Sequence, residues 1–247
     1  MAVAISTRPA HRSFLTPLPL RRPLRAALAL ASGAGLRLLL ASLGMVPVTL
    51  IALSTFGLGL RSLAVHVALP AVAVLGVLVA RHRAAGALAA WALPAGVVAT
   101  AIYDASRFGF LWAGVVDHDP IPHIGTALGL EPAGVVGYLW RYLGNGAGLA
   151  LAFLALGLRG VRVGVAYGLA VCAGLLVTLA VSPHGEELLF ALTPGTVVMA
   201  TVGHAIFGAV LGSLAGAKSA AASRPSPVIR HDRRRAATVE RLRVYAQ

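Results

Sequence analysis

Ionisable side chains inside long apolar segments are the groups in this sequence best suited to chemistry. Asp104 and Arg107 interrupt an apolar run over residues 84–116. A charge inside a membrane-length apolar segment is costly, so Asp104 is expected to pair with a cation. Arg107 follows three residues later on the same face of a helix, and Arg141 lies in a later apolar segment. The sequence therefore predicts an ion pair of Asp104 with Arg107 or Arg141.

Asn145 and His204 extend this predicted polar core, because both also lie in apolar segments. In a structural interpretation, they form hydrogen bonds between helices. In a functional interpretation, the same groups line an outward-opening pocket. Arg107 and Arg141 would then hold an anionic group, Asp104 would orient one arginine, and His204 would bind or shuttle a proton.

Secondary site candidates are Tyr103, His66, His184 and Glu186. The spacings of the histidines and acids in the predicted outer loops, residues 117–132 and 182–187, match no zinc signature. His66 and His204 are the only pair of histidines inside apolar segments that could ligate haem. Their expected depths differ by about 9 Å at a rise of 1.5 Å per residue. We therefore expect neither a metal nor a cofactor.

The composition is that of a membrane protein. Hydrophobic residues make up 58% of the 247-residue chain and charged residues only 12%, about half the fraction usual for soluble proteins. The formal net charge of +13 does not require nucleic acid as a partner, because the basic residues lie in turns and tails. The partners expected are the lipid bilayer, anionic lipid headgroups at the basic tails, and a small polar ligand.

The apolar segments predict an all-α protein with six transmembrane helices, at about 38–60, 62–80, 84–103, 133–157, 163–181 and 188–217. Residues 1–36 are predicted to form a basic disordered cytoplasmic tail, 37–217 the transmembrane domain, and 218–247 a second basic cytoplasmic tail. With six spans, 18 of the 21 Lys and Arg residues fall on one side. The positive-inside rule then places both termini in the cytoplasm, in a bacterial-type cytoplasmic membrane.

Glycines recur at four-residue intervals in the last three predicted spans. They form the series 160, 164 and 168, the series 208, 212 and 216, and the pair 144 and 148. Small residues at this spacing let helix backbones approach closely in lipid. Spans four, five and six are therefore expected to pack tightly, and a glycine-rich face is a candidate for contact with another helix or another copy.

Four short patterns resemble a loosely defined group of polytopic bacterial membrane proteins. They are Tyr103-Asp104 with Arg107, Asn145-Gly146, Ser182-Pro183, and Gly203-His204 followed by Gly208 and Gly212. The resemblance covers residues 96–212. Related chains often carry a histidine three residues before the asparagine, where this sequence has Tyr142. The resemblance implies a recurring polar core and no particular activity.

The leading functional hypothesis is binding or transport of a small ligand in an outward-facing intramembrane pocket built on Asp104, Arg107, Arg141, Asn145 and His204. One alternative is a membrane enzyme that acts on a lipid-linked or apolar substrate, with His204 or Asp104 as the acid or base. The other is an accessory subunit of a membrane complex, in which the polar core is purely structural.

Overall fold

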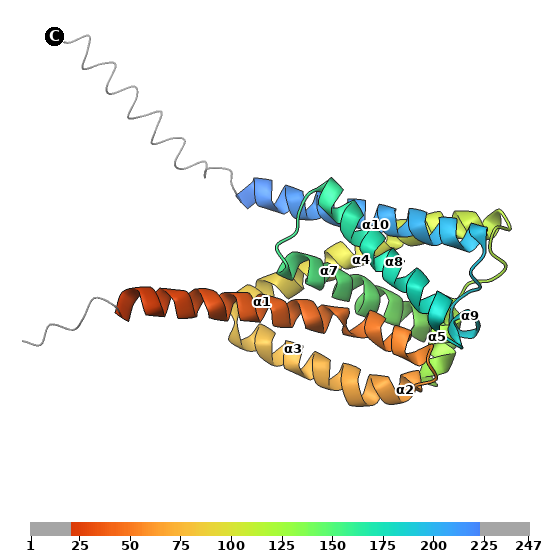
Figure 1. Ribbon diagram of the computed structural model, residues 1–247, viewed down its shortest axis with the longest axis horizontal. Coiled ribbons are helices and arrows are strands. Elements are labelled where there is room, and N and C mark those ends of the chain that lie inside the picture. The colour runs from red at the N-terminus through yellow and green to blue at the C-terminus, as the bar shows by residue number, and fades with distance from the viewer. Residues whose placement is uncertain (1–20, 223–247) are drawn as a thin grey trace, which may run out of the picture. The chain divides into compact units, whose positions relative to one another are not determined.

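The computed structural model describes the backbone of residues 21–222 and the side chains of residues 33–217, and the described part contains helices and no strands. The chain divides into two compact units, Met1–Leu36 and Arg37–Gln247, and the packing described below is that of the second unit. The elements in chain order are α1 (Arg21–Ser54), α2 (Leu60–Leu63), η1 (Ala64–Ala68), α3 (Leu69–Arg81), α4 (Arg83–Trp112), α5 (Ile121–Leu128), α6 (Ala133–Leu139), η2 (Trp140–Gly146), α7 (Ala147–Ala155), α8 (Val161–Val181), α9 (Gly185–Leu188) and α10 (Pro194–Ala222) (Figure 1). η1 and η2 are π-helices.

In the part of the chain that the structure describes, five helices are long and apolar enough to cross a membrane. They are Gly33–Ser54, Leu60–Arg81, Arg83–Trp112, Val161–Val181 and Pro194–Ala217. These helices correspond to five of the six predicted spans, with shifted ends. The first ends at Ser54 rather than near residue 60, and the last begins at Pro194 rather than residue 188.

The predicted fourth span, residues 133–157, is not one continuous α-helix. It consists of α6, η2 and α7, which have seven, seven and nine residues and follow one another directly. The π-helix divides the segment, so no single helix in it reaches the length of a span. At the N-terminal side, α1 begins at Arg21, so residues 21–36 of the predicted disordered tail are helical. The rest of both predicted tails, 1–20 and 223–247, lies outside the described residues.

Glycine contacts bring the long helices together. A Cβ added to Gly164 in α8 would lie 2.0 Å from the carbonyl oxygen of Gly208 in α10, so no larger residue fits at this crossing. The predicted close packing of spans five and six is therefore confirmed. The fourth segment instead uses its glycines against α4 and α1, through Gly146 and Gly148.

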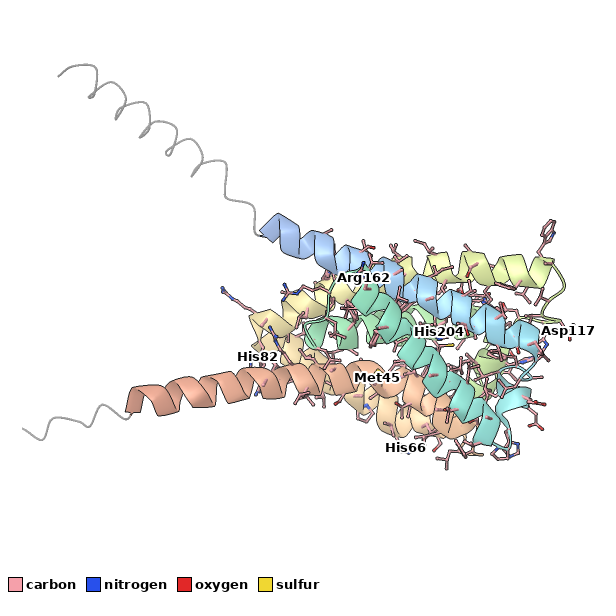
Figure 2. The ribbon with its side chains drawn as sticks, turned by 45° about the horizontal axis from the view of Figure 1, so that its top comes forward. Met45, His66, His82, Asp117, Arg162 and His204 are labelled. Atoms are coloured by element: carbon pink, nitrogen blue, oxygen red, sulfur yellow. The ribbon has the colours of Figure 1, made fainter. Side chains whose placement is uncertain are left out.

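One end of the bundle gathers the short helices α2, α5 and α9 (Figure 1). The loop between α4 and α5 returns to the bundle here, and Asp117 marks this end in Figure 2. Buried apolar side chains from α5, including Ile121 and Ile124, pack with Leu50 and Met199 of the long helices. α5 is therefore part of the hydrophobic core and not an exposed surface helix.

Candidate functional site

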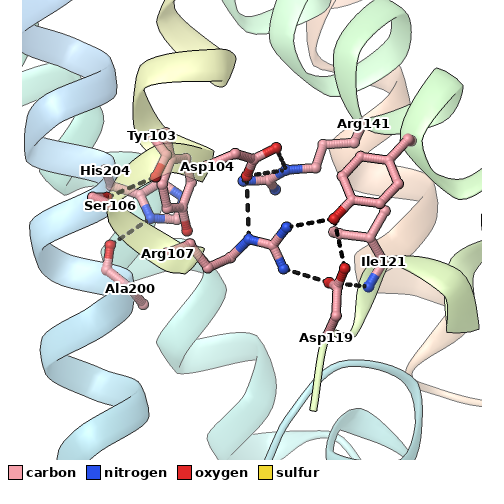
Figure 3. Close-up of polar contacts among 10 residues, drawn as sticks. Tyr103, Asp104, Ser106, Arg107, Asp119, Ile121, Arg141, Ala200 and His204 are labelled. Carbon is pink, nitrogen blue, oxygen red and sulfur yellow. Dashed lines mark hydrogen bonds and ion pairs between the residues drawn. The ribbon is translucent and has the colours of Figure 1, made fainter. Parts of the chain in front are cut away.

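The predicted ion pair is present, and both arginines take part in it. Asp104 is 1% exposed, and its Oδ1 accepts a hydrogen bond from Arg107 Nε at 3.1 Å. Arg141 Nε lies 2.7 Å from Oδ1 and 2.9 Å from Oδ2 of the same carboxylate, and Arg141 Nη2 also donates to Oδ1 (Figure 3). Asp104 is therefore the shared counter-charge of two buried guanidinium groups.

A second acid, from the loop before α5, joins this network. Asp119 accepts hydrogen bonds from Arg107 Nη1 and, at 2.5 Å, from the Tyr138 hydroxyl (Figure 3). The Tyr138 hydroxyl in turn accepts a hydrogen bond of 2.9 Å from Arg107 Nη2. We call Asp104, Arg107, Asp119, Tyr138 and Arg141 the charge cluster. Its two acids and two arginines make it neutral overall.

Asp119 is also fixed by the backbone, because its Oδ1 accepts the N–H of Ile121 at 3.0 Å, at the first residue of α5. Burial opposes ionisation of this carboxyl, but the hydrogen bonds from Tyr138, Ile121 and Arg107 outweigh it and lower its pKa below the ordinary value. Asp119 therefore stays ionised at neutral pH and ties the start of α5 to α4.

Glycines and the π-helix position Arg141 opposite Asp104. η2 carries both Arg141 and Asn145, and π-helices are rare elements that often occur at functional sites. A Cβ on Gly96 of α4 would lie 2.3 Å from the carbonyl oxygen of Gly146, so α4 and η2 meet at backbone distance. This close approach lets the Arg141 side chain reach the carboxylate of the neighbouring helix.

A cavity of about 570 Å³ adjoins the charge cluster. Its walls are mainly apolar side chains of α1, α8 and α10, and α5 closes one side through Ile121 and Ile124. Arg107 and Arg141 reach it from the charge cluster. Tyr103, Asn145 and His204 are its other main polar residues. The volume lies in the range usual for small-ligand sites.

Tyr103 lies between an arginine and a histidine. The guanidinium of Arg141 lies 4.6 Å from the centroid of the Tyr103 ring, and the ring of His204 lies 5.1 Å from it. A Cβ on Gly203 would lie 1.8 Å from the Tyr103 ring, so α10 needs glycine here to admit it. Tyr103 thus connects the charge cluster to His204.

His204 and Asn145 do not form the interhelical hydrogen bonds that the structural interpretation predicted. His204 Nδ1 lies 2.8 Å from the carbonyl oxygen of Ala200, one turn earlier in its own helix (Figure 3). A carbonyl only accepts, so Nδ1 carries the proton and Nε2 is left as an acceptor. Asn145 Oδ1 is buried and has no hydrogen-bond partner among the described residues.

The remaining secondary candidates lie elsewhere. His66 is exposed on η1 (Figure 2), with its Nδ1 2.9 Å from the carbonyl oxygen of Ser62. It is not among the residues that line the cavity. His184 is exposed and lies 3.3 Å from Glu187, and Glu186 is exposed on α9. Within the described part of the chain, no group of three or more His, Cys, Asp or Glu side chains could hold a metal ion.

Two members of the charge cluster were not among the predicted site residues. Asp119 was expected to be one acid among several in an outer loop, and Tyr138 was not singled out. Tyr138 lies three residues before Arg141 and seven before Asn145, so helical spacing already places it near their face. No local pattern indicates that Asp119 returns to Arg107.

The sequence matches no protein-family model, no curated protein and no solved structure. The arginine charges are already neutralised by Asp104 and Asp119, and the cavity wall presents hydrogen-bonding groups without net charge.

Proposed function

We propose that this chain is a multi-pass membrane protein that binds a small ligand in the cavity beside the charge cluster. One observation supports the proposal. A mainly apolar cavity of about 570 Å³ lies inside a bundle of apolar helices, and one of its walls is made of fixed polar side chains. Membrane proteins keep ionisable groups in their interior chiefly where these groups line a pathway or a site. In this proposal, the bound ligand could also be the substrate that the protein transports across the membrane.

In this proposal the chain crosses the membrane six times, with both termini in the cytoplasm. α6, η2 and α7 form the fourth crossing, because together they exceed the roughly 20 residues that a bilayer requires. The distribution of basic residues supports the orientation. The α5 end of the bundle, with its acidic loops, would then lie outside.

Cysteine labelling tests this orientation. Cys172 is buried and is the only cysteine in the sequence, so Cys172→Ala gives a background without thiols. A Glu186→Cys variant in that background should react with a membrane-impermeant maleimide in intact cells. A His82→Cys variant should react only after the membrane is permeabilised. The reverse labelling pattern would reject the proposed orientation. It would not affect the proposal that the cavity binds a ligand.

Filling the cavity tests ligand binding. Gly174 of α8 lines the cavity, and a Cβ added there would meet no atom within 4 Å, so Gly174→Leu adds bulk without displacing backbone. Gly76 of α3 also has open space and does not line the cavity, so Gly76→Leu is the matched control. Native mass spectrometry of protein released from lipid nanodiscs would measure retained dodecanol, its methyl ether and dodecanoate.

The unchanged protein and Gly76→Leu should retain at least one of these three probes, and Gly174→Leu should lose it. Equal retention of every probe by Gly174→Leu and Gly76→Leu would refute binding in the cavity. The charge cluster would then be a structural element of a membrane-complex subunit, which is the second candidate function. It is favoured by the complete mutual pairing of the four charges.

A further inference from the structure

We infer that the cavity takes a lipid-soluble molecule with a neutral, hydrogen-bond-donating head, such as a long-chain alcohol, and that this molecule enters sideways from the bilayer between α1 and α8. The inference rests on the proposed binding function and names the class of ligand. Three observations support it: the charge balance of the wall, two acceptors that have no hydrogen-bond partner among the described residues, and the position of the opening.

The charge balance argues against an anionic head. Arg141 directs Nε and Nη2 to Asp104, and Arg107 directs its nitrogens to Asp104, Asp119 and Tyr138. An anion would therefore have to compete with two carboxylates already in place. Within a low-dielectric site, the added negative charge would be repelled by both acids and would have no unneutralised cation to meet.

Asn145 Oδ1 and His204 Nε2 are hydrogen-bond acceptors that a ligand with a donor group would satisfy. Asn145 Oδ1 is buried without a hydrogen-bond partner among the described residues, although buried acceptors are usually paired. His204 presents Nε2 as an acceptor, because Nδ1 donates to Ala200. Both residues line the same cavity. A hydroxyl can donate to one of these atoms, whereas the methyl ether of the same alcohol has no O–H and cannot.

The opening of the cavity lies between two helices and below their ends. Thr49 of α1 and both Ala170 and Gly174 of α8 line the cavity and are exposed, so the cavity reaches the surface there. Thr49 is about 8 Å from the end of α1, and Gly174 about 10 Å from the end of α8, at 1.5 Å per residue. With the helix ends at the membrane surface, this opening faces hydrocarbon rather than water.

The apolar walls match such a route. Val48 and Ala52 of α1 and both Val171 and Leu175 of α8 line the cavity, so these two helices offer contacts for an alkyl chain. Asn145 and His204 line the same cavity and provide its polar acceptors. A molecule with one hydrogen-bond donor at its end could donate to Asn145 or His204, while its apolar chain contacts the apolar side chains of α1 and α8.

The experiment compares three probes that share one chain. Protein in lipid nanodiscs is equilibrated with an equimolar mixture of dodecanol, its methyl ether and dodecanoate, and the retained amounts are measured by native mass spectrometry. We expect about tenfold more dodecanol than ether, the ratio given by about 1.4 kcal/mol. Less dodecanoate than dodecanol should be retained. Gly174→Leu should lose all three probes, and Gly76→Leu should behave as the unchanged protein.

Asn145→Leu isolates the donor contact. The side chain of Asn145 makes no hydrogen bond to any described residue, so its replacement removes an acceptor without breaking an internal bond. A hydroxyl donates to only one of the two acceptors, so the double variant Asn145→Leu, His204→Phe should retain dodecanol and ether within about twofold of each other. His204→Phe keeps a ring against Tyr103, and the single variant that loses the preference identifies the acceptor.

The outcomes separate the inference from the proposed function. Retention of dodecanol and ether in equal amounts by the unchanged protein, with loss in Gly174→Leu, would overturn the donor head and keep the cavity. Preferential retention of dodecanoate would also overturn it and point to an anionic head. No Gly174-dependent retention of any probe would reject the binding function itself.

Discussion

Replacing Asp104 with asparagine should destabilise this protein more than any other single change of charge in the cluster. Asp104 is 1% exposed and is the only acid that contacts Arg141 in the described part of the chain. Asp104→Asn keeps the shape and leaves Arg141 buried without a counter-charge. Removal of one partner of a buried ion pair costs about 3–5 kcal/mol, and we expect a loss within this range.

Asp119→Asn is the matched comparison. Its side chain is 23% exposed, and Arg107 would keep Asp104 after the change. The expected cost is about 2 kcal/mol, within the range usual for a hydrogen bond to a charged group. The contrast between the two variants follows from burial and from the number of partners, and not from the chemical change, which is the same.

A double-mutant cycle gives the sharper measurement. Arg141→Gln removes the buried cation, so adding it to Asp104→Asn should recover part of the loss, with a coupling energy of about 2–3 kcal/mol. The free energy of unfolding would be measured by denaturant titration in mixed micelles. If the two single losses simply add, or if Asp104→Asn costs no more than Asp119→Asn, the assignment of Asp104 as the shared counter-charge is wrong.

Three further changes test the packing and the loop contact. Gly164→Ala should cost about 1–3 kcal/mol, because its Cβ would lie 2.0 Å from the carbonyl oxygen of Gly208, whereas Gly76→Ala should be neutral in the same unfolding assay. Tyr138→Phe removes the hydroxyl bonded to Asp119 at 2.5 Å and should cost about 1 kcal/mol. The pKa of Asp119 is lowered in the folded protein, so its contribution is present above the unfolded value of about 3.9 and is lost as pH falls through the folded value. Unfolding profiles below about pH 4 should therefore differ less between Asp119→Asn and the unchanged protein than at pH 7.

The helical content and most of the spans could be predicted because hydrophobic length is a local property. Five predicted spans correspond to helices of sufficient length and apolarity. The helix ends were less predictable, since they depend on tertiary contacts. Residues 189–193 are apolar enough to continue a helix, yet α10 begins at Pro194, where the side chains of Thr193 and Thr196 bond to the backbone of the turn. The π-helix η2 has no signature in hydropathy at all.

The site was predictable only where helical spacing carries the information. The pairing of Asp104 with Arg107 follows from their three-residue separation, and the pairing with Arg141 follows from the cost of unpaired charge in lipid. The contact of Asp119 with Arg107 could not be predicted in this way. Asp119 lies in a loop, where side chains follow no regular spacing, so the local sequence does not indicate that the loop folds back onto the bundle. The structural interpretation, one of the two left open, predicted that Asn145 and His204 bond between helices, but His204 bonds within its own helix.

The charge cluster has a consequence for any ligand-binding role, because it joins the cavity to the α5 end of the bundle. Arg107 lines the cavity and also holds Asp119, which fixes the first residue of α5, and Ile121 and Ile124 of α5 line the same cavity. A ligand that displaced Arg107 would therefore loosen the contact that keeps α5 in place. A neutral ligand that bonds to Asn145 and His204 leaves this contact intact, whereas an ionic ligand would have to break it. If the cavity binds a ligand as proposed, the arrangement that makes the wall neutral would select against charged ligands and would leave the contact between Arg107 and Asp119 in place.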